Sequence, residues 1–282
     1  MFDMSCHYTQ VLKSIPWCAI IIAMTNVFDL KQFANEKGLE LPHQSAILEE
    51  ATENIVSKYS HDKEQIKDNF DSMIFETEKE AYNVYLKHEQ QYGERVFNAF
   101  FEYLQENKEI NAINEAGSVL GSYFYSLDRF FLSLKQSRTV RAGKTFEGIT
   151  RNLFKILDYP FEEQVTIDGG NTPDFLMPSA EHYEANAPDC IIFTSKRTLR
   201  ERWRQIVTEG TRGLGFYLAT MDEGISKAQL NEMQHNRIFV VVPEQIKTKK
   251  YSETVNVLSF TRFFNDYLDP AVERWRRNGV IS

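Results

Sequence analysis

Hydrophobic positions recur at helical spacing through the first half of the chain. Residues 46–59 have apolar side chains three to four positions apart, and residues 62–108 are charged and polar with a recurring apolar stripe. Residues 116–134, rich in Tyr and Phe, predict a further helix. Such periods are typical of amphipathic helices. Gly93 predicts a break or a cap within the second segment. We therefore expect a helical N-terminal part.

The pattern changes near Arg138, where short apolar runs begin to alternate with helical periods. The expected helices cover 145–157, 199–209 and 260–277, and the expected strands cover 164–167, 173–176, 190–194, 216–220 and 237–242. Strands that alternate with helices predict an α/β fold with a mixed central β-sheet flanked by helices. We expect residues 1–137 to form the helical part and residues 138–282 the core, packed together as one compact domain.

Composition places the chain among ordinary globular proteins, with 282 residues of which 42% are hydrophobic and 26% are charged. Cys6, Cys18 and Cys190 have neither metal-site nor disulfide-framework spacing, so we expect the reducing cytoplasm. The longest apolar run, 15–24, is too short to span a bilayer. Asp3 upstream of it, and the lack of a small-residue cleavage site after it, weaken a signal-peptide interpretation. No membrane partner is expected.

The formal net charge of −8 argues against nucleic acid as a partner, but phosphate binding depends on local charge. Between residues 196 and 212 six basic residues stand against two acidic ones. Arg138, Arg141 and Lys144 form a second basic group. We predict that these three residues and Arg197 contact a phosphate backbone.

One set of side chains has the composition of a centre for metal-dependent phosphodiester hydrolysis, which needs clustered oxygen ligands and a cation. Asp174 lies at the end of a short expected strand, and Lys196 follows the apolar strand 190–194. Because neighbouring strand ends can converge, both side chains can face one phosphate. Glu209, on the next helix, can return a carboxylate to the same place. Glu147, on the helix before the first strand, is a fourth candidate.

Each of these residues also has an ordinary interpretation. A lysine after a strand is usually solvated, Glu209 alone is typical of a helix surface, and Glu147 near a helix start suits the helix dipole. Asp189 is a rival to Asp174, because Pro-Asp occurs at both places. Asp189, however, begins the strand that carries Lys196, and seven residues of straight strand span about 23 Å. The spacing therefore favours Asp174.

The arrangement resembles the PD-(D/E)XK nucleases. Their usual signature has an acid two residues before the lysine, where this chain has Thr194. One branch instead carries its second metal-binding carboxylate on the following helix, about a dozen residues after the lysine, and Glu209 occupies that place. This branch comprises type II restriction endonucleases that cut sites built on CC and GG. The resemblance covers roughly residues 138–210.

Further residues extend the resemblance to the CCNGG and CCWGG cutters. In these enzymes an Arg-Glu-Arg triplet a few residues past the lysine reads the two G·C pairs of each half-site, and this chain has Arg200, Glu201 and Arg202 there. Arginine can grip guanine O6 and N7, while glutamate accepts from cytosine N4. The basic segment 138–147 is similar to the one that introduces a glutamate, here Glu147, in these enzymes.

The resemblance implies a bacterial type II restriction endonuclease with a PD-(D/E)XK core, which cleaves double-stranded DNA at a palindromic CCNGG-like site. It implies Mg²⁺ held by Asp174 and Glu209, assisted by Glu147, with Lys196 at the scissile phosphate. A palindromic site implies a homodimer, with a tetramer also open. Aromatics in 70–85 could hold flipped bases, but core packing explains them equally well. A non-specific or repair nuclease and a non-catalytic DNA-binding protein remain alternatives.

Two other classes of site are disfavoured. Gly143, Lys144 and Thr145 match the end of a Walker A loop, but Arg138 stands where that motif needs its first glycine, so an ATPase is not expected. The six histidines are scattered without metal-ligand spacing.

Overall fold

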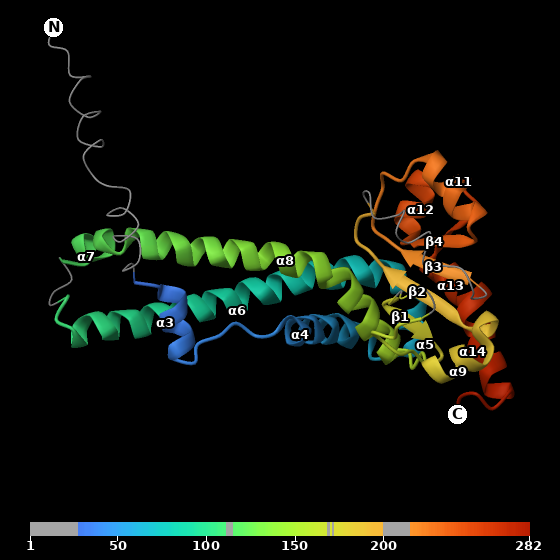
Figure 1. Ribbon diagram of the computed structural model, residues 1–282, viewed down its shortest axis with the longest axis horizontal. Coiled ribbons are helices and arrows are strands. Elements are labelled where there is room, and N and C mark those ends of the chain that lie inside the picture. Colours follow the sequence, from blue (N-terminus) through green and yellow to red (C-terminus); the bar gives the residue numbers. More distant parts are fainter. Residues whose placement is uncertain (1–27, 111–114, 168–169, 171, 200–214) are drawn as a thin grey trace, which may run out of the picture. The chain divides into compact units, whose positions relative to one another are not determined.

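The computed structural model describes residues 28–110, 115–167, 170, 172–199 and 215–282. Two compact units emerge from the contacts within the chain. The helical unit comprises Met1–Leu41 and His88–Thr139, and the sheet unit comprises Pro42–Lys87 and Val140–Ser282. Two long helices, α6 (Phe70–Glu106) and α8 (Phe124–Ile156), both labelled in Figure 1, contribute residues to both units. The division into 1–137 and 138–282 within one domain stays a prediction.

The helical unit is built around aromatic side chains. It contains α3 (Leu30–Glu36), α7 (Ala116–Ser122) and parts of α6 and α8. Asp29 caps α3 by accepting hydrogen bonds from the backbone N–H groups of Lys31 and Gln32. Phe33, Phe100 and Phe130 are buried in its core. The apolar stripe that the sequence shows in this half is thus the core-facing side of its helices.

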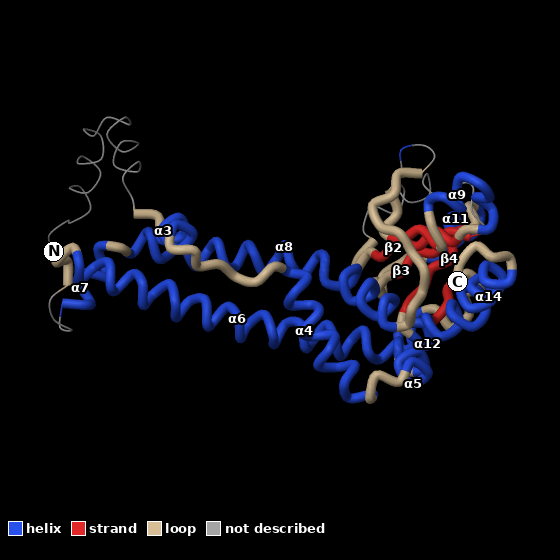
Figure 2. The backbone as a smooth tube through the Cα atoms, turned by 90° about the horizontal axis from the view of Figure 1, so that it is seen from below, coloured by secondary structure: helices blue, strands red, loops and turns tan. Residues whose placement is uncertain are grey.

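The sheet unit contains a five-stranded mixed sheet, shown in red in Figure 2. Its strands lie in the order β1 (Phe175–Met177), β2 (Ile191–Ser195), β3 (Gly215–Ala219), β4 (Ile238–Val242) and β5 (Val257–Ser259). Strand β1 is antiparallel to β2, and the other neighbours are parallel. The strands are almost entirely buried, which explains their continuous apolar runs. The predicted mixed central sheet is confirmed.

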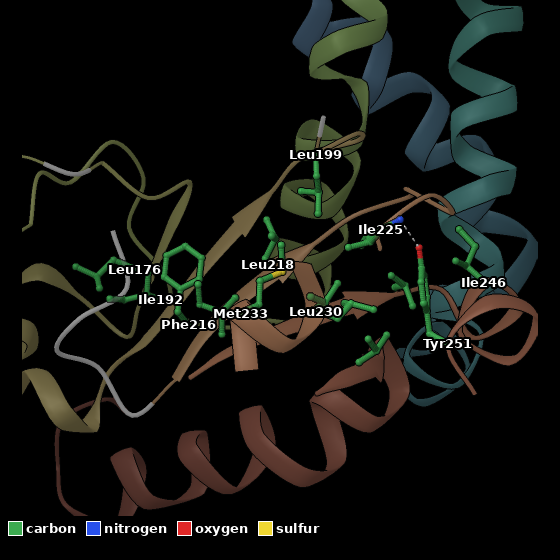
Figure 3. Packing of buried hydrophobic residues seen from close by; sticks show 14 of the residues in the cluster. Leu176, Ile192, Leu199, Phe216, Leu218, Ile225, Leu230, Met233, Ile246 and Tyr251 are labelled. Atoms are coloured by element: carbon green, nitrogen blue, oxygen red, sulfur yellow. Dashed lines mark hydrogen bonds between the residues drawn. The ribbon is translucent and has the colours of Figure 1, made fainter. Parts of the chain in front are cut away.

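One face of the sheet packs against α11 (Lys227–His235) and α12 (Glu244–Lys250). Leu230 and Met233 of α11 join Leu218 of the sheet in one buried cluster (Figure 3). At the edge of that cluster the Ile225 N–H donates to the Tyr251 hydroxyl at 3.1 Å. Side chains at even positions of β2 point to this face.

The opposite face is aromatic and carries the C-terminal part of α8. The ring of Phe154 in α8 lies 5.6 Å from Phe175 of β1 and 5.2 Å from Phe193 of β2, between centroids. Phe263 also packs on Phe193. These contacts fix α8 against the two strands that lead to the predicted site.

The remaining elements are α4 (Gln44–Val56), η1 (Ser57–Tyr59), α5 (Lys63–Asp68), α9 (Ala180–Asn186), η4 (Ala187–Asp189), α13 (Phe260–Phe263), the π-helix η6 (Phe264–Leu268) and α14 (Asp269–Arg277).

Several expected elements differ from the observed ones. Gly93 does not interrupt α6, since a helix tolerates one glycine at a cost of about 1 kcal/mol. Helix α8 continues through Arg138, where the sequence pattern changes. The strand expected at 164–167 is not formed, and Gln164 adopts a left-handed conformation with φ 59°. Within the described residues no helix is long and apolar enough to cross a membrane.

Candidate active site

Asp174 and Lys196 meet where β1 and β2 come together. Antiparallel pairing sets Phe175 opposite Phe193, which brings Asp174 beside the last residues of β2. The Ser195 N–H donates to Asp174 Oδ2 at 2.7 Å, and Lys196 Nζ donates to Oδ1 and Oδ2 at 3.1 and 3.0 Å. The Lys196 N–H donates to the carbonyl of Ala219 in β3, so the residue that follows β2 is also fixed.

The side chains of Asp174 and Lys196 are buried to different extents. The Asp174 side chain is 11% exposed, whereas that of Lys196 is 34% exposed. The carboxylate is therefore shielded from solvent, but the ammonium keeps an open side from which a phosphate can approach. Removing either partner would leave a charge partly buried and uncompensated, which is costly.

Glu147 in α8 adds a second carboxylate to this site. Burial raises its pKa, and the negative charge of Asp174 raises it further. The positive charges of Lys196 and Arg151 act in the opposite direction, and Arg151 also donates a hydrogen bond from Nη2 to Glu147 Oε1 at 2.9 Å. Glu147 thus lies close enough to Asp174 and Lys196 for their charges to interact. A cation between the carboxylates would relieve their repulsion.

The donor set fits a hard divalent cation. Asp174 and Glu147 supply carboxylate oxygens, which Mg²⁺ prefers, and the Lys196 ammonium lies beside them. Within the described ranges no group of three His, Cys, Asp or Glu side chains gathers that could hold a metal. Glu209, the third predicted carboxylate, lies outside the described residues.

The predicted base-reading residues Arg200, Glu201 and Arg202 also lie outside the described residues. The residue just before them is well anchored. Leu199 is buried in the core of the sheet unit, and its N–H donates to Asp222 Oδ2 at 2.9 Å.

Two of the residues predicted to contact the DNA backbone, Arg138 and Arg141, have partners within the chain. Arg138 donates from Nε to both carboxylate oxygens of Glu89, at 2.9 and 3.1 Å, within the helical unit. Arg141 donates to the carbonyl of Pro42 at 3.0 Å, and its guanidinium lies 5.4 Å from the centre of the Tyr85 ring. Both residues help to hold the chain's own fold, so their role toward DNA stays a prediction.

The other two residues predicted to contact the DNA backbone, Lys144 and Arg197, differ from each other. Lys144 is exposed on α8. Arg197, next to Lys196, forms a two-pronged ion pair with Glu78 of α6, with Nε–Oε1 and Nη2–Oε2 distances of 2.6 and 3.2 Å. The hydrogen bond to Glu78 raises the pKa of Arg197. The sequence pattern did not single out Glu78, because it is 119 residues away.

Asp189 lies before β2, at the end opposite Lys196. Its Oδ2 contacts His182 Nε2 at 2.8 Å, and its Oδ1 accepts from Arg274 Nε at 2.6 Å. The Trp275 indole N–H donates to its backbone carbonyl at 3.1 Å. Burial acts to raise the pKa of Asp189, but His182 and Arg274 bring it below its ordinary value. Asp189 therefore ties α9 and α14 to the sheet.

Arg151 and Glu163 are two site neighbours that the sequence interpretation missed. Arg151 contacts both Glu147 and Glu163. The signal for the first contact was present, since Arg151 stands four residues after Glu147 on a predicted helix. Glu163 could not be found in this way, because it lies in an irregular segment outside the helix.

The family of this chain follows from its similarity to known proteins. The family described as EcoRII C terminal matches residues 103–264, more than half of the chain. This chain belongs to that family. The matched region includes Glu147, Asp174, Lys196 and Glu209. The resemblance to a family of type II restriction endonucleases is thereby confirmed.

Two curated members are similar over part of their length. The type II restriction enzyme SsoII of Shigella sonnei is 30% identical over 191 residues, which are 64% of this chain and 60% of that protein. The type II restriction enzyme EcoRII of Escherichia coli is 36% identical over 141 residues, 47% of this chain and 34% of that protein. The chain thus matches about three fifths and one third of the length of these relatives.

Solved structures share the fold. Metal-depleted Ecl18kI in complex with uncleaved DNA superposes with a TM-score of 0.64 at 23% identity, over 90% of this chain and 86% of that one. The PspGI–substrate DNA complex superposes with a TM-score of 0.58 at 19% identity, over 83% and 94% of the two chains. The predicted restriction-endonuclease-like core with a helical N-terminal part is confirmed at the level of the fold.

Proposed function

We propose that this protein is a type II restriction endonuclease that hydrolyses double-stranded DNA at a palindromic site containing CC and GG, of the CCNGG kind. The observation that carries the proposal is the contact of Lys196 with both carboxylate oxygens of Asp174, with Glu147 beside them, inside the region that matches the family. The names of the relatives, type II restriction enzymes SsoII and EcoRII, point to the same activity.

In this proposal Asp174 and Glu209 hold Mg²⁺, and Glu147 assists directly or through water. When bound, such a cation lowers the pKa of a water molecule and offsets negative charge on the phosphate. Lys196 has its own part, because its exposed side can contact a phosphate oxygen and stabilise charge that develops there. Asp174 keeps this lysine oriented through its two carboxylate oxygens.

Recognition is assigned to Arg200, Glu201 and Arg202, which directly follow the anchored residue Leu199. Such a triplet reads guanine and cytosine edges in the major groove. The phosphates of the DNA backbone are contacted by Arg138, Arg141, Lys144 and Arg197.

A palindromic target calls for a two-fold assembly, so we infer a homodimer, with a tetramer as a further state. Residues 1–137 would contribute to dimerisation and to DNA contacts. The proposed setting is the bacterial cytoplasm, where such an enzyme would act in a restriction-modification system.

The test is digestion of a plasmid of known sequence with the purified protein and Mg²⁺. Discrete fragments with CC/GG at every cut end are expected. A smear would indicate a non-specific nuclease, and an unchanged plasmid would indicate a protein without nuclease activity. Sequencing the cut ends gives the full site and the position of cleavage.

Variants then test the centre. Asp174→Ala and Lys196→Ala should each abolish cutting, whereas Asp189→Asn, at the other Pro-Asp dipeptide, should leave the folded protein able to cut. Arg200→Ala should weaken cutting at the specific site. Fragments that persist unchanged with Asp174→Ala would contradict the proposed centre.

A further inference from the structure

Arg151 connects two carboxylates that lie on different segments. From α8 its Nη2 donates to Glu147 Oε1 at 2.9 Å, and its Nε contacts Glu163 Oε1. The side chains of Arg151, Glu147 and Glu163 are 27%, 25% and 27% exposed. A solvated pair at i and i+4 on a helix surface would be more open and would lack the second acidic partner.

Glu163 is in turn fixed to the strand that leads from Asp174. The preceding residue, Glu162, pairs with Leu176 through two backbone hydrogen bonds of 2.9 Å, one in each direction. Leu176 stands two residues after Asp174 on β1. Arg151 therefore joins the helix that carries Glu147 to the backbone that positions Asp174.

This connection through Arg151 can reduce the charge repulsion between the carboxylates at the site. Glu147 and Asp174 carry like charges and repel each other when both are ionised. Lys196 offsets part of this repulsion from the Asp174 side, and Arg151 offsets it from the Glu147 side. The planar guanidinium can hold two carboxylates at once in a fixed direction, which the ammonium of a lysine does less well.

We propose that Arg151 is a positioning residue of the nuclease centre, which, anchored by Glu163, holds the Glu147 carboxylate toward Asp174 and Lys196. This inference rests on the proposed function, in which Glu147 assists at the metal site. In this role Arg151 acts through Glu147, and no contact with DNA or metal is assigned to it.

The first experiment compares Arg151→Met, Arg151→Lys and Glu163→Gln with two matched controls. Lys155→Met removes a charge from an exposed position one turn along the same helix. Glu162→Gln changes the neighbouring acid, whose Oε2 accepts from the Ala180 N–H at 3.2 Å. Single-turnover cleavage of an oligonucleotide carrying the site should slow about 10- to 100-fold in Arg151→Met, the usual effect of losing a group that orients a metal-site ligand.

Further outcomes separate positioning from general damage. Arg151→Lys should retain an intermediate rate, Glu163→Gln should slow cleavage less than Arg151→Met, and both controls should match the wild type. Affinity for the same oligonucleotide, measured with Ca²⁺ in place of Mg²⁺, should change less than about twofold, because Arg151 is assigned no DNA contact. A loss of affinity equal to the loss of rate would overturn the positioning role.

A double-mutant cycle tests whether Arg151 acts through Glu147. In a Glu147→Gln background, Arg151→Met should slow cleavage little further. A readout independent of cleavage is the titration of Mn²⁺ by electron paramagnetic resonance, in which Arg151→Met and Glu147→Gln should weaken binding to a similar extent. Full additivity in the cycle, or Mn²⁺ binding that is unchanged in Arg151→Met but weakened in Glu147→Gln, would refute the inference.

The experiments can refute the proposed nuclease function and the role of Arg151 independently of each other. If the wild type did not cut, or Asp174→Ala still did, the nuclease assignment would fall, and the Mn²⁺ titration would still decide whether Arg151 orients Glu147. If the wild type and Asp174→Ala behave as proposed and the cycle is additive, only the role of Arg151 is wrong.

Discussion

The aspartates of the two Pro-Asp dipeptides in this chain lie at opposite ends of β2 and have different partners. Asp174 faces Lys196 at one end of β2, while Asp189 is bound by His182 and Arg274 at the other. The sequence could predict this distinction, because Asp189 and Lys196 bracket one apolar strand. It could not predict the partners of Asp189, since Arg274 is 85 residues away and reaches it only through the tertiary fold.

The partners of Asp189 predict a pH-dependent effect on stability. The folded-state pKa of Asp189 lies below the ordinary value of 3.8, so its ionised form stabilises the fold above that pH. This contribution is lost as the pH falls through the folded-state pKa. Asp189→Asn should lower the free energy of unfolding by about 1–3 kcal/mol at pH 7, because Arg274 and His182 lose a charged partner.

Urea unfolding of the wild type and Asp189→Asn at a series of pH values measures this effect. The difference between the two proteins should be largest near neutral pH and should shrink below about pH 4, where the wild-type carboxyl becomes protonated in the unfolded and then in the folded state. A difference that stays constant from pH 7 to pH 3 would show that the charge of Asp189 is not what stabilises the fold.

The ion pair between Arg197 and Glu78 predicts an effect of Glu78 on DNA binding. Glu78 neutralises a cation that stands next to Lys196. If Arg197 contacts a DNA phosphate, as proposed, that phosphate must compete with Glu78 for it. Exposed ion pairs are worth about 0.2–1 kcal/mol, and Glu78→Gln should therefore tighten DNA binding by up to about fivefold.

The matched control is Glu80→Gln on the same helix, where the carboxylate accepts from Asn54 Nδ2 at 2.9 Å and should have little effect on DNA binding. Fluorescence anisotropy with a labelled duplex in Ca²⁺ measures the affinities. The gain from Glu78→Gln should disappear when Arg197→Gln is also present. Equal gains from both glutamate variants would mean that only the overall charge matters.

At the scale of elements, the sheet could be predicted better than the helices. Strands β2, β3 and β4 are buried apolar runs, and each begins and ends within about two residues of its expected limits. Strand β5 was not predicted, because it has only three residues and no distinct run. The expected strand at 164–167 failed because alternation alone cannot show the left-handed turn at Gln164.

Helix α8 shows why local pattern misjudged helix limits. Gly143 and Gly148 both lie inside it, although glycine weakens helices. At Gly148 an added Cβ would clash with the side chain of Leu48 from α4, whereas at Gly143 nothing lies within 4 Å. Gly148 thus leaves room for the Leu48 side chain of α4, a tertiary reason that a single sequence does not reveal.

This contrast predicts opposite effects for the same substitution. Gly143→Ala should raise the free energy of unfolding by about 0.5–1 kcal/mol through helix propensity. Gly148→Ala should lower it by about 1–3 kcal/mol, because the buried Leu48 must move. Thermal unfolding of both variants checks the signs. Adding Leu48→Ala should cost less in the Gly148→Ala background than in the wild type, and equal costs would rule out the clash.

Across the whole molecule, only some residues of the candidate site could be predicted from the sequence. The sequence indicated Asp174, Lys196 and Glu147 because each stands at the end of a strand or on a helix beside one. It did not indicate Arg151, Glu163 or Glu78, whose contacts depend on how α8, α6 and the segment before β1 pack together. The proposed ligand residues can thus be predicted from local pattern, whereas the contacts of their neighbours depend on the tertiary fold.

The protein carries a formal net charge of −8, which on its own opposes binding to DNA. Affinity must come from local basic groups, and each phosphate neutralised by such a group makes binding more sensitive to salt. If Lys144 contacts one phosphate, Lys144→Gln should reduce the slope of log K against log salt by about 1. Lys155→Gln, on an exposed position of the same helix, removes the same charge and should leave the slope unchanged. Anisotropy titrations across a range of KCl concentrations, in Ca²⁺, give both slopes. Equal shifts in the two variants would assign the effect to net charge, whereas a shift confined to Lys144→Gln would assign a phosphate to Lys144.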